Sequence, residues 1–175
     1  RVTDRPSRNL DGWMLTRAYN IANFHKHTAD ADFAVVEGVM GLFDGYDGKS
    51  EAGSTAQMAK WLDLPVLLVV NAKSMARSAA ALVQGFANFD SDLTFAGVVF
   101  NHVGSDRHLK YLMEALSGNV ELPCWGGLAR NETLAIPERH LGLITDQDYS
   151  LSGDYINVLI RSIDSDLKAT DLIQS

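Results

Sequence analysis

The chain has 175 residues, a length typical of one domain, and its 46% hydrophobic and 21% charged residues fit a globular protein rather than a disordered one. The net charge of −7 argues against a nucleic acid as partner, because phosphate backbones usually bind a basic face. No apolar run approaches the roughly 20 residues of a membrane span, so no membrane partner is expected. The lone cysteine, Cys124, excludes an internal disulfide and favours the reducing cytoplasm.

Two patterns alternate along the chain. Apolar residues at helical spacing predict helices over 11–28 (with Asp11 as N-cap), 54–62, 76–89, 105–116 and 155–163. Short apolar runs predict strands over 31–37, 65–70, 94–100 and 122–128. Because these runs are apolar throughout, they are typical of strands that are covered on both faces. The alternation predicts a doubly wound α/β domain with a mainly parallel sheet and helices on both faces. Residues 164–175 are polar and are expected to fray or to lead into another domain.

The loop after the first predicted strand holds two candidate catalytic acids. Ligands bind beyond the carboxyl ends of strands in such sheets, and Glu37 ends the 31–37 run. An unpaired carboxylate there is costly to bury, and acids at this position commonly bind Mg²⁺ in phosphate-handling α/β enzymes. Asp44 lies seven residues on and shares the site if the loop folds back. The alternative is a salt-bridged glutamate and a turn-forming aspartate.

Three further features are candidates for ligand binding, each with an ordinary structural alternative. Ser54 and Thr55 open a helix whose free N–H groups favour an anion, although serine is also a common cap. Asn101 follows the 94–100 run, where its amide can bond a base edge or simply form a turn. Arg139, next to Pro137, can meet a phosphate or a carboxylate, or form a surface ion pair.

Other chemistry is not supported by the spacing. Gly48, Lys49 and Ser50 end like a phosphate-binding loop, but Phe43 occupies the position of its first glycine, so a surface loop is favoured. The five histidines lack metal-ligand spacing, and Ser54, Ser78 and Cys124 lack the signature of a catalytic triad.

Several strings, in this order, resemble the cobyrinic acid a,c-diamide synthase family. They are RPSRNLD (5–11), WML (13–15), VEGVMGLFDG (36–45), GSTA (53–56), ARS (76–78), GVVFN (97–101) and PERHLGL (137–143). The resemblance implies a fold similar to dethiobiotin synthetase among the P-loop NTPases. It also implies ATP- and Mg²⁺-dependent amidation of two corrin side-chain carboxylates through an acyl phosphate. The ammonia would come from glutamine in a glutaminase domain.

The same resemblance implies roles for individual residues. Glu37 corresponds to the metal-site acid and Asp44 to an acid at the reacting centre, so both are predicted to be catalytic. Ser54 and Thr55 correspond to the substrate side of the site. Asn101 corresponds to the residue at the adenine of ATP, and Pro137 and Arg139 to a loop near the nucleotide.

The chain also departs from the family pattern. The family's first strand and its phosphate loop should precede Arg5, a glutaminase domain should follow Ser175, and His102 stands where Arg is commoner. We therefore expect residues 1–175 to be a partial synthetase domain, a processed product or a fragment that is inactive alone. The open alternatives are cobyric acid synthase, a nickel-sirohydrochlorin diamide synthase, or a non-catalytic nucleotide- or partner-binding module. A homodimer also stays open.

Overall fold

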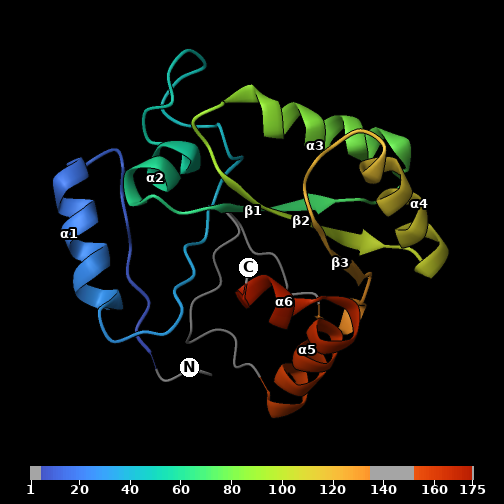
Figure 1. Ribbon diagram of the computed structural model, residues 1–175. Coiled ribbons are helices and arrows are strands. Elements are labelled where there is room, and N and C mark those ends of the chain that lie inside the picture. Colours follow the sequence, from blue (N-terminus) through green and yellow to red (C-terminus); the bar gives the residue numbers. More distant parts are fainter. Residues whose placement is uncertain (1–4, 135–151, 175) are drawn as a thin grey trace. The chain divides into compact units, whose positions relative to one another are not determined.

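A computed structural model of the chain describes residues 5–134 and 152–174. The chain divides into two compact units. The N-terminal unit comprises Arg1–Pro65 with Asp92–Thr94, and the sheet unit comprises Val66–Ser91 with Phe95–Ser175. Figure 1 labels the elements of both units. Within the described residues, no helix combines the length and the apolar character needed to cross a membrane.

The first helix of the N-terminal unit, α1, is shorter than the 11–28 helix that the sequence predicted. It spans Arg17–Thr28, and the side chain of Thr16 caps it by accepting the N–H of Tyr19. Asp11 is therefore not the helix cap; its Oδ1 accepts the N–H groups of Trp13 and Met14 in a preceding turn. The buried Asn20 ties that turn to the helix, since its side chain bonds both the N–H and the carbonyl of Asp11.

The second helix, α2, spans Thr55–Leu62 and confirms the predicted helix with Ser54 as its cap. The Ser54 hydroxyl accepts the N–H of Gln57 at 3.1 Å. At the other end Asp63 adopts the left-handed conformation (φ 53°) and donates its N–H to the Ala59 carbonyl, which terminates the helix.

The predicted strand over 31–37 is not present. This stretch has neither helical nor strand structure. Its apolar side chains are open to solvent: Val35 is 81% exposed and Phe33 is 57% exposed. A strand requires a neighbour for its N–H and C=O groups, and no backbone hydrogen bond joins 32–37 to another segment of the described chain. The apolar run was therefore insufficient evidence for a buried strand.

The sheet unit contains three parallel strands in the order β1–β2–β3. β1 spans Val66–Asn71, β2 Phe95–Val103 and β3 Cys124–Ala129, so the three other predicted strands are confirmed. β2 is longer than expected, and Asn101 and His102 lie within it instead of following it. The register places Val70 beside Phe100 and Asn71 beside Asn101.

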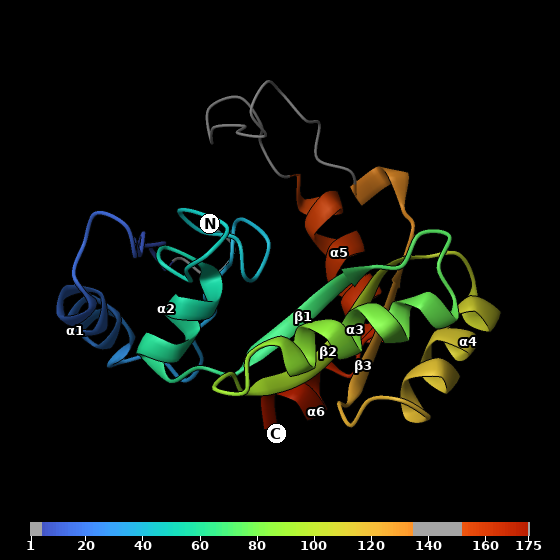
Figure 2. The same ribbon diagram turned by 90° about the horizontal axis from the view of Figure 1, so that it is seen from above.

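Helices connect and cover these strands, which confirms the α/β class. They are α3 (Arg77–Phe89), α4 (Asp106–Ser117), α5 (Gly153–Asp166) and α6 (Ala169–Gln174), with a short 3₁₀ helix at Glu132–Leu134. Figures 1 and 2 show α3 and α4 on one face of the sheet and α5 and α6 on the other. The polar stretch that was expected to fray, residues 164–175, holds the end of α5 and all of α6.

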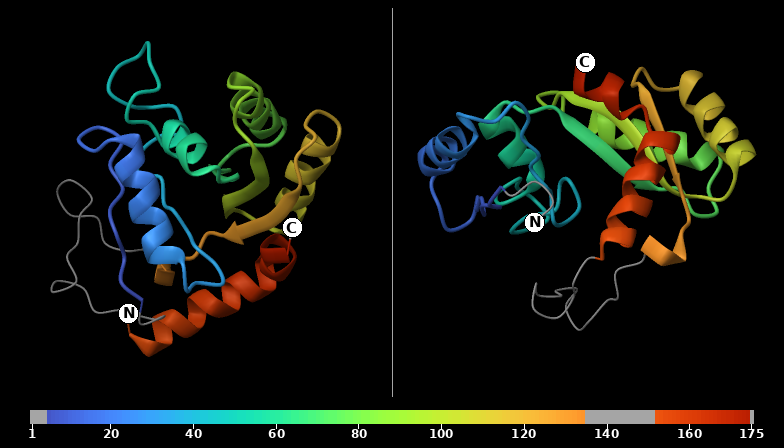
Figure 3. Two further views of the ribbon diagram at one scale, coloured as in Figure 1. Left: turned by 60° about the vertical axis from the view of Figure 1, so that its left-hand side comes forward. Right: turned by 90° about the horizontal axis from the view of Figure 1, so that it is seen from below.

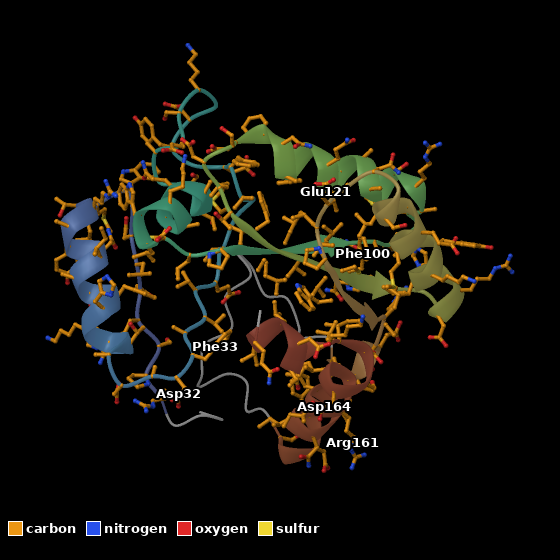
Figure 4. The ribbon with its side chains drawn as sticks, in the orientation of Figure 1. Asp32, Phe33, Phe100, Glu121, Arg161 and Asp164 are labelled. Atoms are coloured by element: carbon orange, nitrogen blue, oxygen red, sulfur yellow. The ribbon has the colours of Figure 1, made fainter. Side chains whose placement is uncertain are left out.

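The core of the sheet unit lies between the sheet and α3 and α4. Val83 from α3, Leu112 from α4, and Val98 and Phe100 from β2 have no exposed surface. In Figure 4, Phe100 lies among the side chains between these elements. Apolar burial of this extent is the main stabilising contribution to such a unit.

Strand β3 contains a glycine, Gly126, that allows other backbone to approach closely. A Cβ at Gly126 (φ 121°) would collide with the backbone carbonyl of Asp166, at the end of α5. Gly126 there forms an antiparallel bridge with Leu167, and Lys168 donates its N–H to the Trp125 carbonyl at 2.8 Å. These contacts hold the end of α5 on β3, and Figure 3 shows the two elements side by side.

Candidate functional site

The loop that carries Glu37 and Asp44 folds back onto the start of α2. A Cβ at Gly38 would lie 2.6 Å from Thr55 Cγ2, and one at Gly45 would lie 3.0 Å from the Ser54 nitrogen. The glycines after both acids therefore contact the first residues of the helix. The loop thus lies along the start of α2 and brings together the four residues of this unit that the sequence singled out. They are Glu37, Asp44, Ser54 and Thr55.

Both carboxylates of this loop are accessible to a ligand. Glu37 and Asp44 are exposed, and neither side chain accepts a hydrogen bond from the described residues. Asp44 lies in a turn that its N–H closes on the Gly41 carbonyl at 3.1 Å, and its carboxylate packs over Gly41. Exposed carboxylate oxygens fit Mg²⁺, which binds proteins through one or two carboxylates and keeps waters and phosphate oxygens as its other ligands. Glu37 does not end a buried strand, so the cost of burying a carboxylate gives no argument for a function of this residue.

The start of α2 is less open to an anion than the sequence suggested. The Leu42 carbonyl accepts the N–H of Ala56 at 2.9 Å, and Ser54 Oγ takes that of Gln57. Ser54 itself is only 2% exposed, whereas Thr55 is half-buried. An anion here would therefore be recognised by the Thr55 side chain and the helix dipole more than by free N–H groups.

The Gly48-Lys49-Ser50 segment is a self-contained turn. Asp47 Oδ1 accepts the N–H groups of Lys49 and Ser50, both at 2.8 Å, as well as the Ser50 hydroxyl at 3.1 Å. These bonds to Lys49 and Ser50 lower the pKa of the Asp47 carboxyl. Because those N–H groups are directed at Asp47, they do not form a phosphate cradle, which agrees with the interpretation as a surface loop.

A second polar cluster lies in the sheet unit, at the carboxyl ends of β1 and β2. Asn71 and Asn101 are register partners there, and the Ala72 N–H bonds the Asn101 carbonyl at 2.8 Å. Asn71 Oδ1 accepts the N–H of Lys73 at 3.1 Å, and Asn101 Oδ1 accepts that of His102 at 2.9 Å. An open depression of about 430 Å³ lies along β1 and α3 beside Asn71. Asn71, and not the predicted base-binding residue Asn101, is the asparagine that lines this depression.

Two histidines complete this edge, and the sequence interpretation had assigned neither of them a role. His102 has a left-handed backbone (φ 56°), and its Nδ1 lies 3.0 Å from Asn71 Oδ1. His108, in the first turn of α4, accepts the Gly104 N–H at Nδ1 (3.0 Å) and contacts the Met75 carbonyl with Nε2 (2.6 Å). His108 therefore joins the loop after β1 to the loop after β2. The usable signal was the presence of two histidines, His102 and His108, within eight residues of the end of the 94–100 run.

Metal and thiol chemistry are limited in the described part of the chain. Residues 5–134 and 152–174 include no group of three or more His, Cys, Asp and Glu side chains that could hold a metal ion without further ligands. Burial raises the pKa of the Cys124 thiol, so this thiol is protonated at neutral pH and is a poor nucleophile. Arg5 and Asp30 form an exposed ion pair at 2.7 Å, which lowers the pKa of that aspartate.

The predicted site residues are divided between the two units, and two of them are not placed. Pro137 and Arg139 lie outside the described residues. Glu37, Asp44, Ser54 and Thr55 belong to the N-terminal unit, and Asn101 belongs to the sheet unit. The two clusters therefore belong to different units of the chain.

Comparison with known proteins gives the context for both clusters. A family model described as an AAA domain matches residues 7–138. The cobyrinate a,c-diamide synthase of Syntrophotalea carbinolica is 51% identical over 166 residues, which are 95% of this chain and 36% of that protein. The protein of the same name from Synechococcus is 52% identical over 143 residues (82% of this chain, 31% of that protein), and that from Methanococcus vannielii is 42% identical over 147 (82% and 32%). The chain spans about a third of the length of these relatives. No solved structure matches it.

Proposed function

The chain belongs to the AAA domain family, and on this premise we propose that it forms the ATP-using part of a cobyrinate a,c-diamide synthase. The observation that carries the proposal is the similarity to proteins of that name, which extends over nearly all of this chain. Because those relatives are about three times as long, we expect the complete reaction to need more than residues 1–175 and the chain alone to be inactive. We place the reaction in the cytoplasm, where an unpaired cysteine such as Cys124 is common.

The proposed reaction is amidation of the a and c side-chain carboxylates of cobyrinic acid. A carboxylate is a poor electrophile, and bound ATP with Mg²⁺ supplies a phosphoryl group that converts one carboxylate oxygen into a leaving group. Ammonia from glutamine, released in another part of the enzyme, then forms the C–N bond as phosphate leaves. Since the reacting groups are anions, the site must neutralise charge as they meet.

The proposed roles follow the two clusters. Glu37 offers its exposed carboxylate to Mg²⁺, and Asp44 orients the substrate carboxylate or accepts a proton from ammonia. Thr55, with the dipole of α2 and the cap provided by Ser54, faces the anionic substrate. At the sheet edge, Asn101 directs its amide toward the base of ATP. We assign Pro137 and Arg139 to the surroundings of the nucleotide on the family resemblance alone.

The test is an amidation assay with the full-length protein. Cobyrinic acid, ATP, Mg²⁺ and free ammonia should yield the a,c-diamide, identified by mass spectrometry and NMR, with no product when ATP is omitted. Parallel reactions with hydrogenobyrinic acid and nickel sirohydrochlorin define the substrate. Amidation at other side chains would instead indicate a cobyric acid synthase. ATP binding without amidation of any of these substrates would contradict the proposal and favour a non-catalytic nucleotide-binding module.

A further inference from the structure

The amide groups of Asn71 and Asn101 have fixed orientations. The two residues are register partners in parallel strands, so their side chains project from the same face of the sheet. Each Oδ1 accepts a backbone N–H, from Lys73 in one case and from His102 in the other. The Nδ2 group of each amide therefore points away from the backbone N–H that Oδ1 accepts. Neither Nδ2 donates a hydrogen bond to another group among the described residues. The edge thus presents amide donors.

The contact between His102 and Asn71 also fixes the tautomer of the neutral imidazole. Asn71 Oδ1 is an amide oxygen that already accepts the Lys73 N–H, so it can only accept from His102 as well. The proton of the His102 ring must then be on Nδ1, and Nε2 has a free lone pair. Side chains of consecutive strand residues normally point to opposite faces of a sheet. His102 directly follows Asn101, but its left-handed backbone (φ 56°) allows its ring to reach the Asn71 side chain. His102 is exposed, so Nε2 is accessible to a ligand.

We propose that His102 Nε2 accepts a hydrogen bond from the exocyclic amino group of an adenine base at Asn101, with Asn71 acting as a positioning residue that sets the ring tautomer. The inference rests on the proposed function, which brings ATP to this edge. Adenine carries a ring-nitrogen acceptor next to its amino donor on both its Watson–Crick and Hoogsteen edges. Asn101 and His102 are consecutive residues of β2, and together they offer the amide donor and the imidazole acceptor that complement this pair of groups. His108, which joins the two adjoining loops, keeps this arrangement in place.

The first test compares two nucleotides in the full-length protein. Calorimetry should show that ATP binds about fivefold more tightly than the purine nucleoside triphosphate that lacks the 6-amino group, the gain expected from one hydrogen bond. His102→Gly removes the ring, and glycine adopts the left-handed backbone freely. In this variant the affinity ratio should fall to about one. Ser74→Gly is the matched control, because Ser74 is also exposed and left-handed (φ 60°) at this edge but provides no ring acceptor.

The second readout is the tautomer itself, which does not depend on activity. Nitrogen NMR of the same protein should show the proton of His102 on Nδ1 and that of His108 on Nε2, so the two rings serve as references for each other. Asn71→Leu should remove the preference at His102 and leave His108 unchanged. The inference is overturned if His102 carries its proton on Nε2, or if the affinity ratio is the same in wild type and His102→Gly. Failure of both nucleotides to bind the wild type would instead contradict the proposed function.

Discussion

Residues 31–37 and 65–71 are alike in sequence but differ in structure. Both are short apolar runs with adjacent valines, and each ends on a polar residue, Glu37 in one case and Asn71 in the other. The second run forms β1, in which Val70 is 4% exposed. The first has no regular structure, and its Val35 is 81% exposed. Figure 4 labels Phe33 from the first run and Phe100 from the strand beside the second.

The difference shows that a neighbouring strand, and not composition, makes such a run a strand. β1 has β2 beside it for its backbone hydrogen bonds, and α3 packs against β1. No described segment forms a backbone hydrogen bond with residues 32–37. The polar residue at the end of each run consequently differs in setting, since Asn71 is held by a register partner and by His102, whereas Glu37 is open to solvent.

The largest expected effect concerns the end of the 31–37 run. If Glu37 binds Mg²⁺, Glu37→Gln in the full-length protein should reduce turnover by at least about 100-fold, since removal of one strong transition-state interaction costs about 3 kcal/mol. The fold should not change, because Glu37 is exposed. Steady-state kinetics at saturating Mg²⁺ measure the effect, and Asp32→Asn, an exposed acid in the same stretch, is the control. Near-normal turnover of Glu37→Gln would show that the residue has no metal role.

The next prediction tests the comparison through matched substitutions. Val70→Ala should lower the free energy of unfolding by about 2 kcal/mol, from lost burial and the cavity that remains. Val35→Ala should change it by less than about 0.5 kcal/mol, as is usual for exposed positions. Urea denaturation followed by circular dichroism measures both. If Val35→Ala were as destabilising as Val70→Ala, the 31–37 run would have a buried partner in solution, and it would not differ from β1 in burial.

These two runs also explain how far sequence reasoning reaches. The strands at 65–70, 94–100 and 122–128 and the helices between them were predictable, because each run lies near its partner in the chain and the connecting helices cover the sheet. The sequence left open whether the loop after Glu37 folds back, and the contacts of Gly38 and Gly45 with the start of α2 show that it does. The orientation of the Asn71 and Asn101 amides was not, because it depends on a left-handed residue and on contacts between loops that have no periodic signal.

A smaller effect is expected at the link between the two loops beyond β1 and β2. His108→Leu leaves the Gly104 N–H and the Met75 carbonyl without this partner, which should cost about 1 kcal/mol of unfolding free energy and raise the KM for ATP more than it lowers kcat. His108→Gln should restore much of both, since its amide has an acceptor and a donor. A purely structural role would lower stability without a change in KM, and this result would contradict a role in holding the nucleotide edge.

The smallest effect is a difference in thiol reactivity between a cysteine in the covered strand β3 and a cysteine in the exposed 31–37 run. Cys124 begins β3, and burial raises the pKa of its thiol because the thiolate loses hydration. At any pH near neutrality a smaller fraction is thus thiolate, the reactive form, than for an exposed cysteine. A thiol introduced by Val35→Cys in the exposed run should therefore be alkylated faster than Cys124, and its rate should reach half-maximum at lower pH, near the ordinary thiol pKa of about 8.5. The raised pKa also means that stability falls as pH rises above that ordinary value, because the folded state then holds a proton that the unfolded state has lost.

Iodoacetamide alkylation followed by mass spectrometry from pH 7 to about pH 10 gives both rate profiles. Coincident profiles for the two thiols would show that β3 does not shield Cys124, and that the covered and uncovered segments differ less than their exposed fractions indicate.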